Sequence, residues 1–213
     1  LSELNHAIES MESGRLDLNG DTRALVGDNY ADMNERYYGN GDCKGSGADH
    51  GTHVAGIISA ISNNEKQIAG VAPKAKIMAI KVFPNAYDSR CAAGIKYAVD
   101  NGAKVINMSF GKSYSWDKAV VDEAIKYAVS KDVLLVQAAG NDNKDIDVEP
   151  NFPNRKYVNG EIAKAYITVG ASGFKDDETL KAEFSNFGKT TVDVFAPGVN
   201  INSTISDSKY KEE

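Results

Sequence analysis

The sequence predicts an α/β fold in which a doubly wound, mainly parallel sheet carries helices on both of its faces. The first supporting observation is that apolar runs of strand length alternate with helical patterns after residue 50, as is typical of parallel strands joined by crossover helices. The second is that the chain has 213 residues, of which 42% are hydrophobic, and can therefore bury one sizeable core without disulfides. No internal repeat or low-complexity tract appears in the chain.

The individual elements follow from the spacing of apolar residues. Helical spacing is predicted after His50, again over residues 92–101, where Gly102 ends the helix, and over residues 116–130. Strand-like runs occur at residues 76–83, 105–108, 133–136, 166–169 and 192–195 and around Ile201. Between residues 76 and 136, strand and helix alternate as in two successive βα units.

The N-terminal region differs in composition from the rest of the chain. Residues 1–13 form an amphipathic helical pattern that ends at Gly14, and residues 17–47 are polar and rich in Asn, Asp, Gly and Tyr. Within this region only residues 24–26 are apolar enough to predict a strand fragment. Residues 17–21 resemble the start of a calcium-binding EF-hand loop, but Thr22 and Asp28 stand where that loop requires Gly and Glu, so this site is rejected.

Charge and cysteine content exclude several classes of protein. The net charge is −6 and the basic residues are scattered, which argues against a nucleic-acid-binding surface. Cys43 and Cys91 match neither a zinc-binding spacing nor a redox pair and leave the compartment open. No apolar run reaches the roughly 18 residues of a membrane span, and the first residues lack a signal-peptide pattern.

The segment HGTHVAG, residues 50–56, contains the strongest candidate for a catalytic group. It places the imidazole of His50 at the start of a helix whose following residues are apolar and small. A general base needs a fixed position within hydrogen-bond reach of its nucleophile, and a packed helix start provides one. The alternative is a His50–His53 metal pair, but no third ligand follows at a suitable spacing, so no metal site is predicted. We expect His53 to pack and hydrogen bond inside the domain.

A second candidate lies after the strand predicted at residues 133–136. The residues that follow are QAAGND, and small residues at the carboxyl end of a strand are where open α/β sheets accept ligands. The side-chain amide of Asn141 can then donate a hydrogen bond to an oxyanion that develops during a reaction. The alternative interpretation of Asn141 taken alone is that it caps a turn.

These segments, in their order along the chain, resemble the subtilisin-like serine proteases, or subtilases. The resemblance covers roughly residues 45–210. Three further segments contribute to it: GVAP at 70–73, FSNFG at 184–188 and VFAPG at 194–198. The resemblance implies a serine endopeptidase in which His50 is the general base and Asn141 is an oxyanion donor.

The resemblance also implies how an extended peptide or protein substrate binds. Residues 105–111 are similar to the family's substrate-binding strand, whose edge pairs with a peptide; the alternative is an ordinary buried strand that ends in a turn. The first specificity pocket would lie between two walls: Ser109, Phe110 and Gly111 on one side, and Ala138, Ala139 and Gly140 on the other. No cofactor is required. A structural calcium ion at residues 62–65 is a hypothesis drawn from the same resemblance.

Two family blocks are missing from the sequence. Subtilases carry an Asp in an Asp-Ser/Thr-Gly context before the histidine and a Ser in a Gly-Thr-Ser-Met-Ala block after it, and neither is present. Asp28 is the nearest substitute acid, whereas Asp42 and Asp49 are more easily explained by turns or solvent. Cys91, Ser46 and Ser59 are not convincing replacement nucleophiles. We therefore expect the acid upstream of residue 1 and the nucleophile beyond residue 213, and we predict that this chain alone is inactive.

The predicted organisation and function follow from these points. Residues 1–44 would be an appended helix and loops, the tail of an insertion, and residues 45–213 a partial catalytic domain. The leading hypothesis is part of a secreted or cell-envelope subtilase, and the alternative is a non-catalytic peptide-binding module. The order of the segments argues against a ligand-binding α/β domain without protease ancestry. A partial domain of this kind would lack an early central strand and the helix that carries the nucleophile. We expect this to expose apolar surface on the sheet and to favour dimers.

Overall fold

The computed structural model describes residues 27, 29, 32, 38–41, 43, 48–82, 88–177 and 179–212. The chain divides into two compact units, residues 1–41 and residues 42–213. The helix predicted over residues 1–13, the strand fragment at 24–26, and Asp28 and Asp42 lie outside the described residues. Every helix and strand described below belongs to the second unit.

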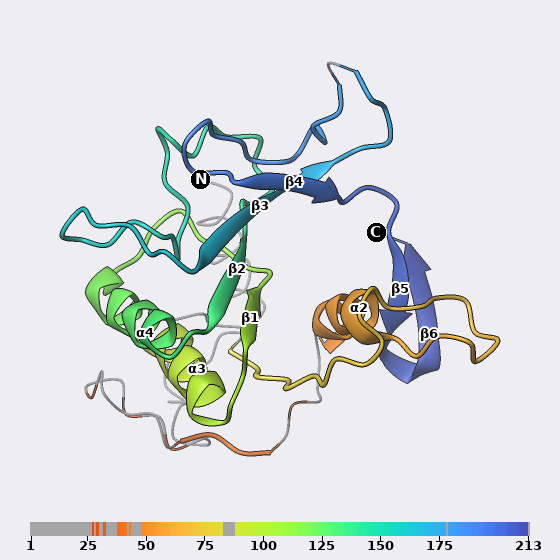
Figure 1. Ribbon diagram of the computed structural model, residues 1–213, viewed down its shortest axis with the longest axis horizontal. Helices are drawn as coiled ribbons and strands as arrows, with labels where there is room; N and C mark the ends of the chain where they lie inside the picture. The colour runs from red at the N-terminus through yellow and green to blue at the C-terminus, as the bar shows by residue number, and fades with distance from the viewer. Residues whose placement is uncertain are drawn as a thin grey trace, which may run out of the picture. The chain divides into compact units, whose positions relative to one another are not determined.

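The second unit contains a four-stranded parallel sheet. Its strands are β1 (Val105–Met108), β2 (Leu134–Ala138), β3 (Tyr166–Ser172) and β4 (Val194–Pro197), and they lie in the order β1-β2-β3-β4 (Figure 1). All three pairings are parallel. The strands predicted at these places are confirmed, with boundaries that shift by up to three residues. Parallel neighbours require crossover connections, and the helical segments between the strands provide them.

Two helices form the core with one face of this sheet. They are α3 (Asp88–Asp100) and α4 (Lys118–Ser130), which lie side by side on the same side of the sheet (Figure 1). Both helices were predicted, and α3 begins four residues before the predicted start. Small buried residues let the two helices and the sheet approach closely. The core combines side chains from these elements: Cys91, Ala92, Ile95, Met108, Val121, Ala124, Ile125, Ala128, Val133, Leu135, Tyr157, Ala163 and Tyr166.

The opposite face of the sheet is also apolar. The register places alternate residues of the four strands on it, and apart from Asn107 these are apolar, among them Val105, Leu134, Val136, Ile167, Val169 and Val194. Strands that are apolar on both faces are typical of a parallel sheet covered on both sides. In this structure Val105 is 57% exposed and Val194 is 50% exposed, so the two ends of this face are open to solvent.

A second cluster joins segments that are far apart in the sequence. Helix α2 (Ala48–Ser59) packs on β5 (Asn202–Ile205), which pairs antiparallel with β6 (Lys209–Glu212) across the turn Ser206–Ser208 (Figure 1). The contact face of α2 includes Gly56, where any Cβ would overlap the hydroxyl groups of Ser203 and Thr204. Glycine at this position therefore allows the helix to lie directly on the strand.

One predicted strand is not observed. Residues 76–82 form no hydrogen-bonded ladder with any described residue, and Ile77 and Met78 are exposed. Phe83 lies outside the described residues. Apolar β-branched residues favour an extended chain, but a strand also requires a neighbouring strand to accept its hydrogen bonds. Ile80 and Val82 instead pack near Gly94 of α3.

Candidate functional site

His50 lies in the first turn of α2 and is exposed. The neighbouring residue Asp49 accepts a hydrogen bond at Oδ1 from the backbone N–H of Ser206 (3.0 Å), which connects the helix start to the turn after β5. Hydrogen bonding to Ser206 lowers the pKa of Asp49, with a smaller contribution from Lys211 and Lys209. This carboxylate is therefore engaged by the hairpin. The hydroxyl of Thr52 donates to the carbonyl oxygen of Ala48 (2.7 Å), one turn earlier in the chain.

His53, one turn later, has a structural role, as predicted. It is buried, and its Nε2 lies 3.1 Å from the carbonyl oxygens of both Ile201 and Lys211. Because both partners are acceptors, Nε2 carries the proton. The buried hydroxyl of Ser203 donates to the carbonyl oxygen of His53 (2.7 Å), and Thr204 Oγ1 donates to that of Thr52 (3.0 Å). These contacts hold α2, the helix that carries His50, against the hairpin formed by β5 and β6.

The two predicted walls lie at the carboxyl ends of neighbouring strands. Residues 109–111 follow β1, and Ala138 ends β2, which pairs with β1 so that Met108 lies opposite Gln137. Parallel strands end at the same edge of a sheet, so the walls come together there. The side chain of Gln137 is buried, and its Nε2 donates to the carbonyl oxygens of Phe110 and, at 3.1 Å, Ala138. Gln137 therefore ties one wall to the other.

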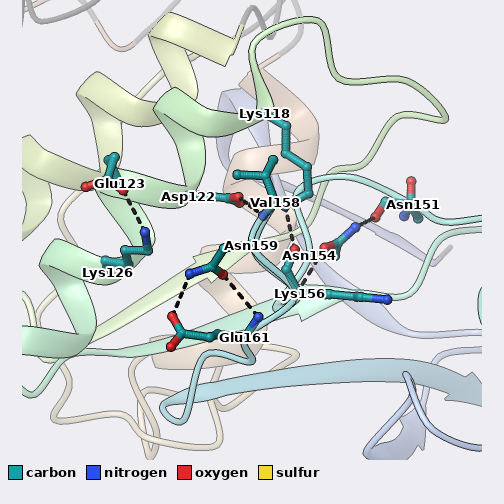
Figure 2. Close-up of polar contacts among 10 residues, drawn as sticks. All are labelled: Lys118, Asp122, Glu123, Lys126, Asn151, Asn154, Lys156, Val158, Asn159 and Glu161. Atoms are coloured by element: carbon teal, nitrogen blue, oxygen red, sulfur yellow. Dashed lines mark hydrogen bonds and ion pairs between the residues drawn. The ribbon is translucent and has the colours of Figure 1, made fainter.

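Asn151 lies against both walls. Its Nδ2 donates to the carbonyl oxygen of Ala139 (2.9 Å). A Cβ placed on Gly111 would lie 2.8 Å from Oδ1 of Asn151, and one placed on Gly140 would lie 3.1 Å from its Nδ2. Asn154 Nδ2 in turn donates to the carbonyl oxygen of Asn151 (2.9 Å; Figure 2). Sequence reasoning missed Asn151, because nothing in its local sequence distinguishes it from any other polar loop residue.

Asn141 is exposed on the loop that follows the second wall, and Asn186 holds the backbone of this loop. Asn186 Oδ1 accepts hydrogen bonds from the backbone N–H groups of Asp142 (2.9 Å) and Lys144 (3.0 Å). Its Nδ2 donates to the carbonyl oxygen of Ala139 (2.9 Å), and its own N–H donates to that of Gly140 (2.9 Å). The side chain of Asn186 is almost fully buried, so Asn141 projects from a loop held on both sides.

The described contacts divide the predicted site residues into two groups. Residues 109–111 and 138–141 come together at the ends of β1 and β2, where Gln137 and Asn151 connect them and Asn186 holds the second segment. The contacts of His50's helix go to β5, β6 and the turn between them.

Two of the substitute nucleophiles considered above, Cys91 and Ser59, have structural surroundings. Burial raises the pKa of Cys91 to about 11, so its thiol stays protonated and unreactive at neutral pH. Cys91 borders a small hollow beside Phe110 and Val121, where Lys112 pairs with the buried carboxylate of Asp88 (2.6 Å). The hydroxyl of Ser59 donates to the carbonyl oxygen of Ala75 (3.0 Å). Ser46 lies outside the described residues.

The loop at residues 62–65 does not present all its oxygens to a calcium ion. Asn64 Oδ1 accepts a hydrogen bond from the backbone N–H of Lys66 (3.2 Å), which engages one of the few side-chain oxygens in this segment. A calcium ion at this loop stays a prediction. A rise in the melting temperature in millimolar calcium would support it, and an unchanged melting temperature would remove it.

The chain is similar to proteases of known sequence and structure. It is 40% identical over 168 residues to thermitase of Thermoactinomyces vulgaris, which covers 78% of this chain and 54% of that protein. It is also 40% identical over 198 residues to the cell wall-associated protease of Bacillus subtilis (strain 168), covering 92% of this chain and 20% of that protein. The chain thus spans about half, or less, of these relatives.

Solved structures show the same fold. The S41 psychrophilic protease aligns with a TM-score of 0.68 at 27% identity, over 84% of this chain and 62% of that one. Sphericase aligns with a TM-score of 0.64 at 26% identity and the same coverage. These similarities confirm the doubly wound, subtilisin-like α/β class. Among the described residues, no helix has the length and apolar character needed to cross a membrane.

A model of the subtilase family matches residues 11–213, nearly the whole chain. This match begins well before the residue near 45 at which the resemblance was expected to start. Together with the similarity to thermitase, it shows that the chain belongs to the subtilase family.

Proposed function

We propose that this chain is part of a serine endopeptidase that hydrolyses peptide bonds through an acyl-enzyme. A serine supplied by another part of the protein would attack the substrate carbonyl, and His50 would take the hydroxyl proton. The side-chain amide of Asn141 would donate to the oxyanion of the tetrahedral intermediate, and His50 would return the proton to the leaving amine. Water would then repeat the cycle on the acyl-enzyme. The 213-residue chain alone would be inactive without its nucleophile and acid.

The observation that carries this proposal is the arrangement of the two walls around Asn151. Gly111 and Gly140 lie against the same side-chain amide, and Asn186 holds the loop from which Asn141 projects. A preorganised donor is effective because it does not have to reorient when negative charge develops. The small residues Ala138, Ala139 and Gly140 would leave space for a substrate side chain between the walls.

The test compares the 213-residue chain with the product of the complete gene on a fluorogenic peptide. We expect hydrolysis only by the complete product. In that product Asn141→Ala should lower kcat about 10²–10³-fold with a smaller change in KM, and His50→Ala should reduce activity at least as strongly. Asn159→Ala, which removes an exposed contact with Glu161, serves as the control. Turnover by the 213-residue chain, or full activity of the His50→Ala variant, would contradict the proposal.

A peptide-binding module without catalysis is the second candidate. It is favoured by β1, which ends the sheet order and has no ladder partner on its outer edge within the described part of the chain. An extended peptide can add to such an edge as a further strand. Trp116 is the single tryptophan and lies five residues after Gly111, so a fluorescence titration with extended peptides would report binding. Saturable binding by the 213-residue chain, together with an inactive complete product, would favour this function.

We also propose two properties of the protein beyond its chemistry. The open apolar face that includes Val105 and Val194 would favour dimers of this chain, and light scattering that shows a clean monomer would count against this.

A secreted or envelope location is supported by similarity to a cell wall-associated protease. Cell fractionation with an antibody against this chain would test it. No nucleic-acid partner is expected for a chain with net charge −6.

A further inference from the structure

The ammonium group of Lys181 is surrounded by neutral oxygen atoms. Its Nζ lies 2.9 Å from Oδ1 of Asn143, 2.9 Å from the carbonyl oxygen of Ala182 and 3.1 Å from that of Ser185. The carbonyl oxygen of Glu183 lies at 3.4 Å, and the ring of Phe187 lies 5.4 Å from Nζ. Among the residues that the structure describes, no carboxylate forms a salt bridge with this ammonium. The described contacts of the cation are therefore neutral oxygen atoms and one aromatic ring.

The backbone on both sides of this group is fixed by hydrogen bonds. Lys181 forms a bridge with Ser172 at the end of β3, and the N–H of Ala182 donates to the carbonyl oxygen of Ala171 (3.0 Å). Ser185 closes a turn by donating its N–H to the carbonyl oxygen of Ala182 (3.0 Å). This turn directs several carbonyl oxygens toward the same point, where mutual repulsion would be unfavourable without a positive charge.

Asn143 belongs to a second loop, residues 140–146, which reaches the same point. It has a positive φ of 53°, an uncommon conformation for a residue other than glycine, and its N–H donates to the carbonyl oxygen of Phe184 (2.8 Å). Its side-chain oxygen then reaches Lys181. The ammonium therefore joins the turn after β3 to the loop at residues 140–146.

We propose that Lys181 is a built-in cation that fills an oxygen-lined site and couples these two loops. Rings of carbonyl oxygens bind monovalent cations by replacing their hydration shell, and an ammonium tethered to the chain does so without losing translational freedom on binding. If the side chain is removed, the same oxygens form a site for a free monovalent cation, with ammonium and potassium as the matching ligands. This inference does not depend on the proposed catalysis, although the coupled loop carries Asn141.

The test is cation rescue of the full 213-residue chain with Lys181→Ala. Melting temperatures are measured at equal ionic strength in ammonium, potassium and choline chloride. We expect the variant to melt below the unsubstituted chain in choline and to regain a large part of that loss in ammonium or potassium. The unsubstituted chain should show no such difference between salts. Lys164→Ala, at an exposed position, is the matched control for loss of a positive charge and should behave like the unsubstituted chain.

Amide hydrogen exchange tests the coupling of the loops directly. The backbone N–H groups of Asn143 and Lys144, which are bonded to Phe184 and Asn186, should exchange about tenfold faster in Lys181→Ala, because a charged hydrogen-bonded group is lost. Ammonium should restore their protection. Lys181→Met fills the space without charge, so it should lose protection as well and respond to no salt.

Several results would overturn the inference. Equal effects of ammonium and choline on Lys181→Ala would show that no cation site forms. Unchanged exchange of Asn143 and Lys144 would show that the loops are not coupled through this group. If Lys181→Ala does not fold in any salt, Lys181→Met decides the question: unsubstituted stability and protection in that variant would show that the charge is not needed. None of these measurements depends on peptidase activity.

Discussion

The imidazole Nε2 of His53 hydrogen bonds to the carbonyl oxygen of Lys211, 158 residues later in the chain, at a distance of 3.1 Å. The same nitrogen also lies 3.1 Å from the carbonyl oxygen of Ile201. One side chain of α2 therefore holds β6 and the residue that precedes β5. The two histidines of the HGTHVAG segment therefore differ in their surroundings, because His50 is exposed and His53 is buried.

We expect His53→Leu to destabilise the protein by about 1–3 kcal/mol, because two carbonyl oxygens that accept from the buried imidazole would lose their donor. Equilibrium denaturation with urea measures this change. His50→Leu is the matched control and should change the free energy of unfolding by no more than about 0.5 kcal/mol. Equal effects of the two substitutions would contradict the structural role of His53.

A second pair of substitutions tests the packing of α2 on β5. Gly56→Ala places a methyl group against Ser203 and Thr204 and should destabilise the protein by about 1–3 kcal/mol. Gly51 lies in the same helix with no atom within 4 Å of an added Cβ, so Gly51→Ala should be neutral or stabilising by up to about 1 kcal/mol. Thermal melting of both variants measures the difference. A stabilising Gly56→Ala would mean that the helix does not lie on this strand.

The loop that carries Asn141 should depend on Asn186. Asn186→Ala removes the acceptor for the N–H groups of Asp142 and Lys144 and should cost about 1–3 kcal/mol. Asn186→Asp keeps an acceptor oxygen but places a carboxylate against the carbonyl oxygen of Ala139, so it should also destabilise the protein. Asn159→Ala, which removes only an exposed contact with Glu161, is the control (Figure 2). Chemical denaturation that ranks Asn159→Ala as the most harmful would refute this role.

The buried carboxylate of Asp122 should contribute far more to the stability of the protein than the carboxylate of its neighbour Glu123. It accepts from Lys118 Nζ (2.6 Å) and from the backbone N–H of Val158 (2.8 Å), and it is buried on α4 (Figure 2). Asp122→Ala leaves the partly buried ammonium of Lys118 without its carboxylate and should lower the free energy of unfolding by about 3–5 kcal/mol. Glu123→Ala breaks only an exposed pair with Lys126 and should cost at most about 0.5 kcal/mol. Urea denaturation of the two variants side by side is the measurement.

Asp147 should make the stability of the protein depend on pH in the acid range. Its carboxylate accepts hydrogen bonds from the hydroxyl and backbone groups of Thr191 and Thr190 and from the N–H of Lys189, which lower its pKa to about 2 from an ordinary value of 3.8. A lowered carboxyl pKa stabilises the folded state above pH 4, and this contribution is lost as the pH falls from about 4 to 2. Asp147→Asn should flatten the dependence of melting temperature on pH in this window. Parallel curves for the two proteins would show that the loop does not need the charge.

The sequence alone determined the strands and helices of the sheet region. Residues 105–108 and 133–136 are short apolar runs of strand length, and residues 116–130 repeat their apolar side chains at helical spacing, so each local pattern predicts its type of element. The order of the family segments also predicted the subtilase fold. The exception is residues 76–82, whose local pattern predicts a strand that finds no partner among the described residues.

Only the tertiary structure decided what supports the candidate site. Asn151 and Lys181 are ordinary polar loop residues in the sequence, and the FSNFG segment gives no sign of what Asn186 contacts, yet these three side chains hold the walls and the loop of Asn141. Asn186 and the N–H of Asp142 are 44 positions apart, and His53 and Lys211 are 158 apart. Hydrophobic periodicity reports local burial, whereas a side-chain hydrogen bond to a distant backbone group depends on two loops meeting in space and leaves no periodic pattern.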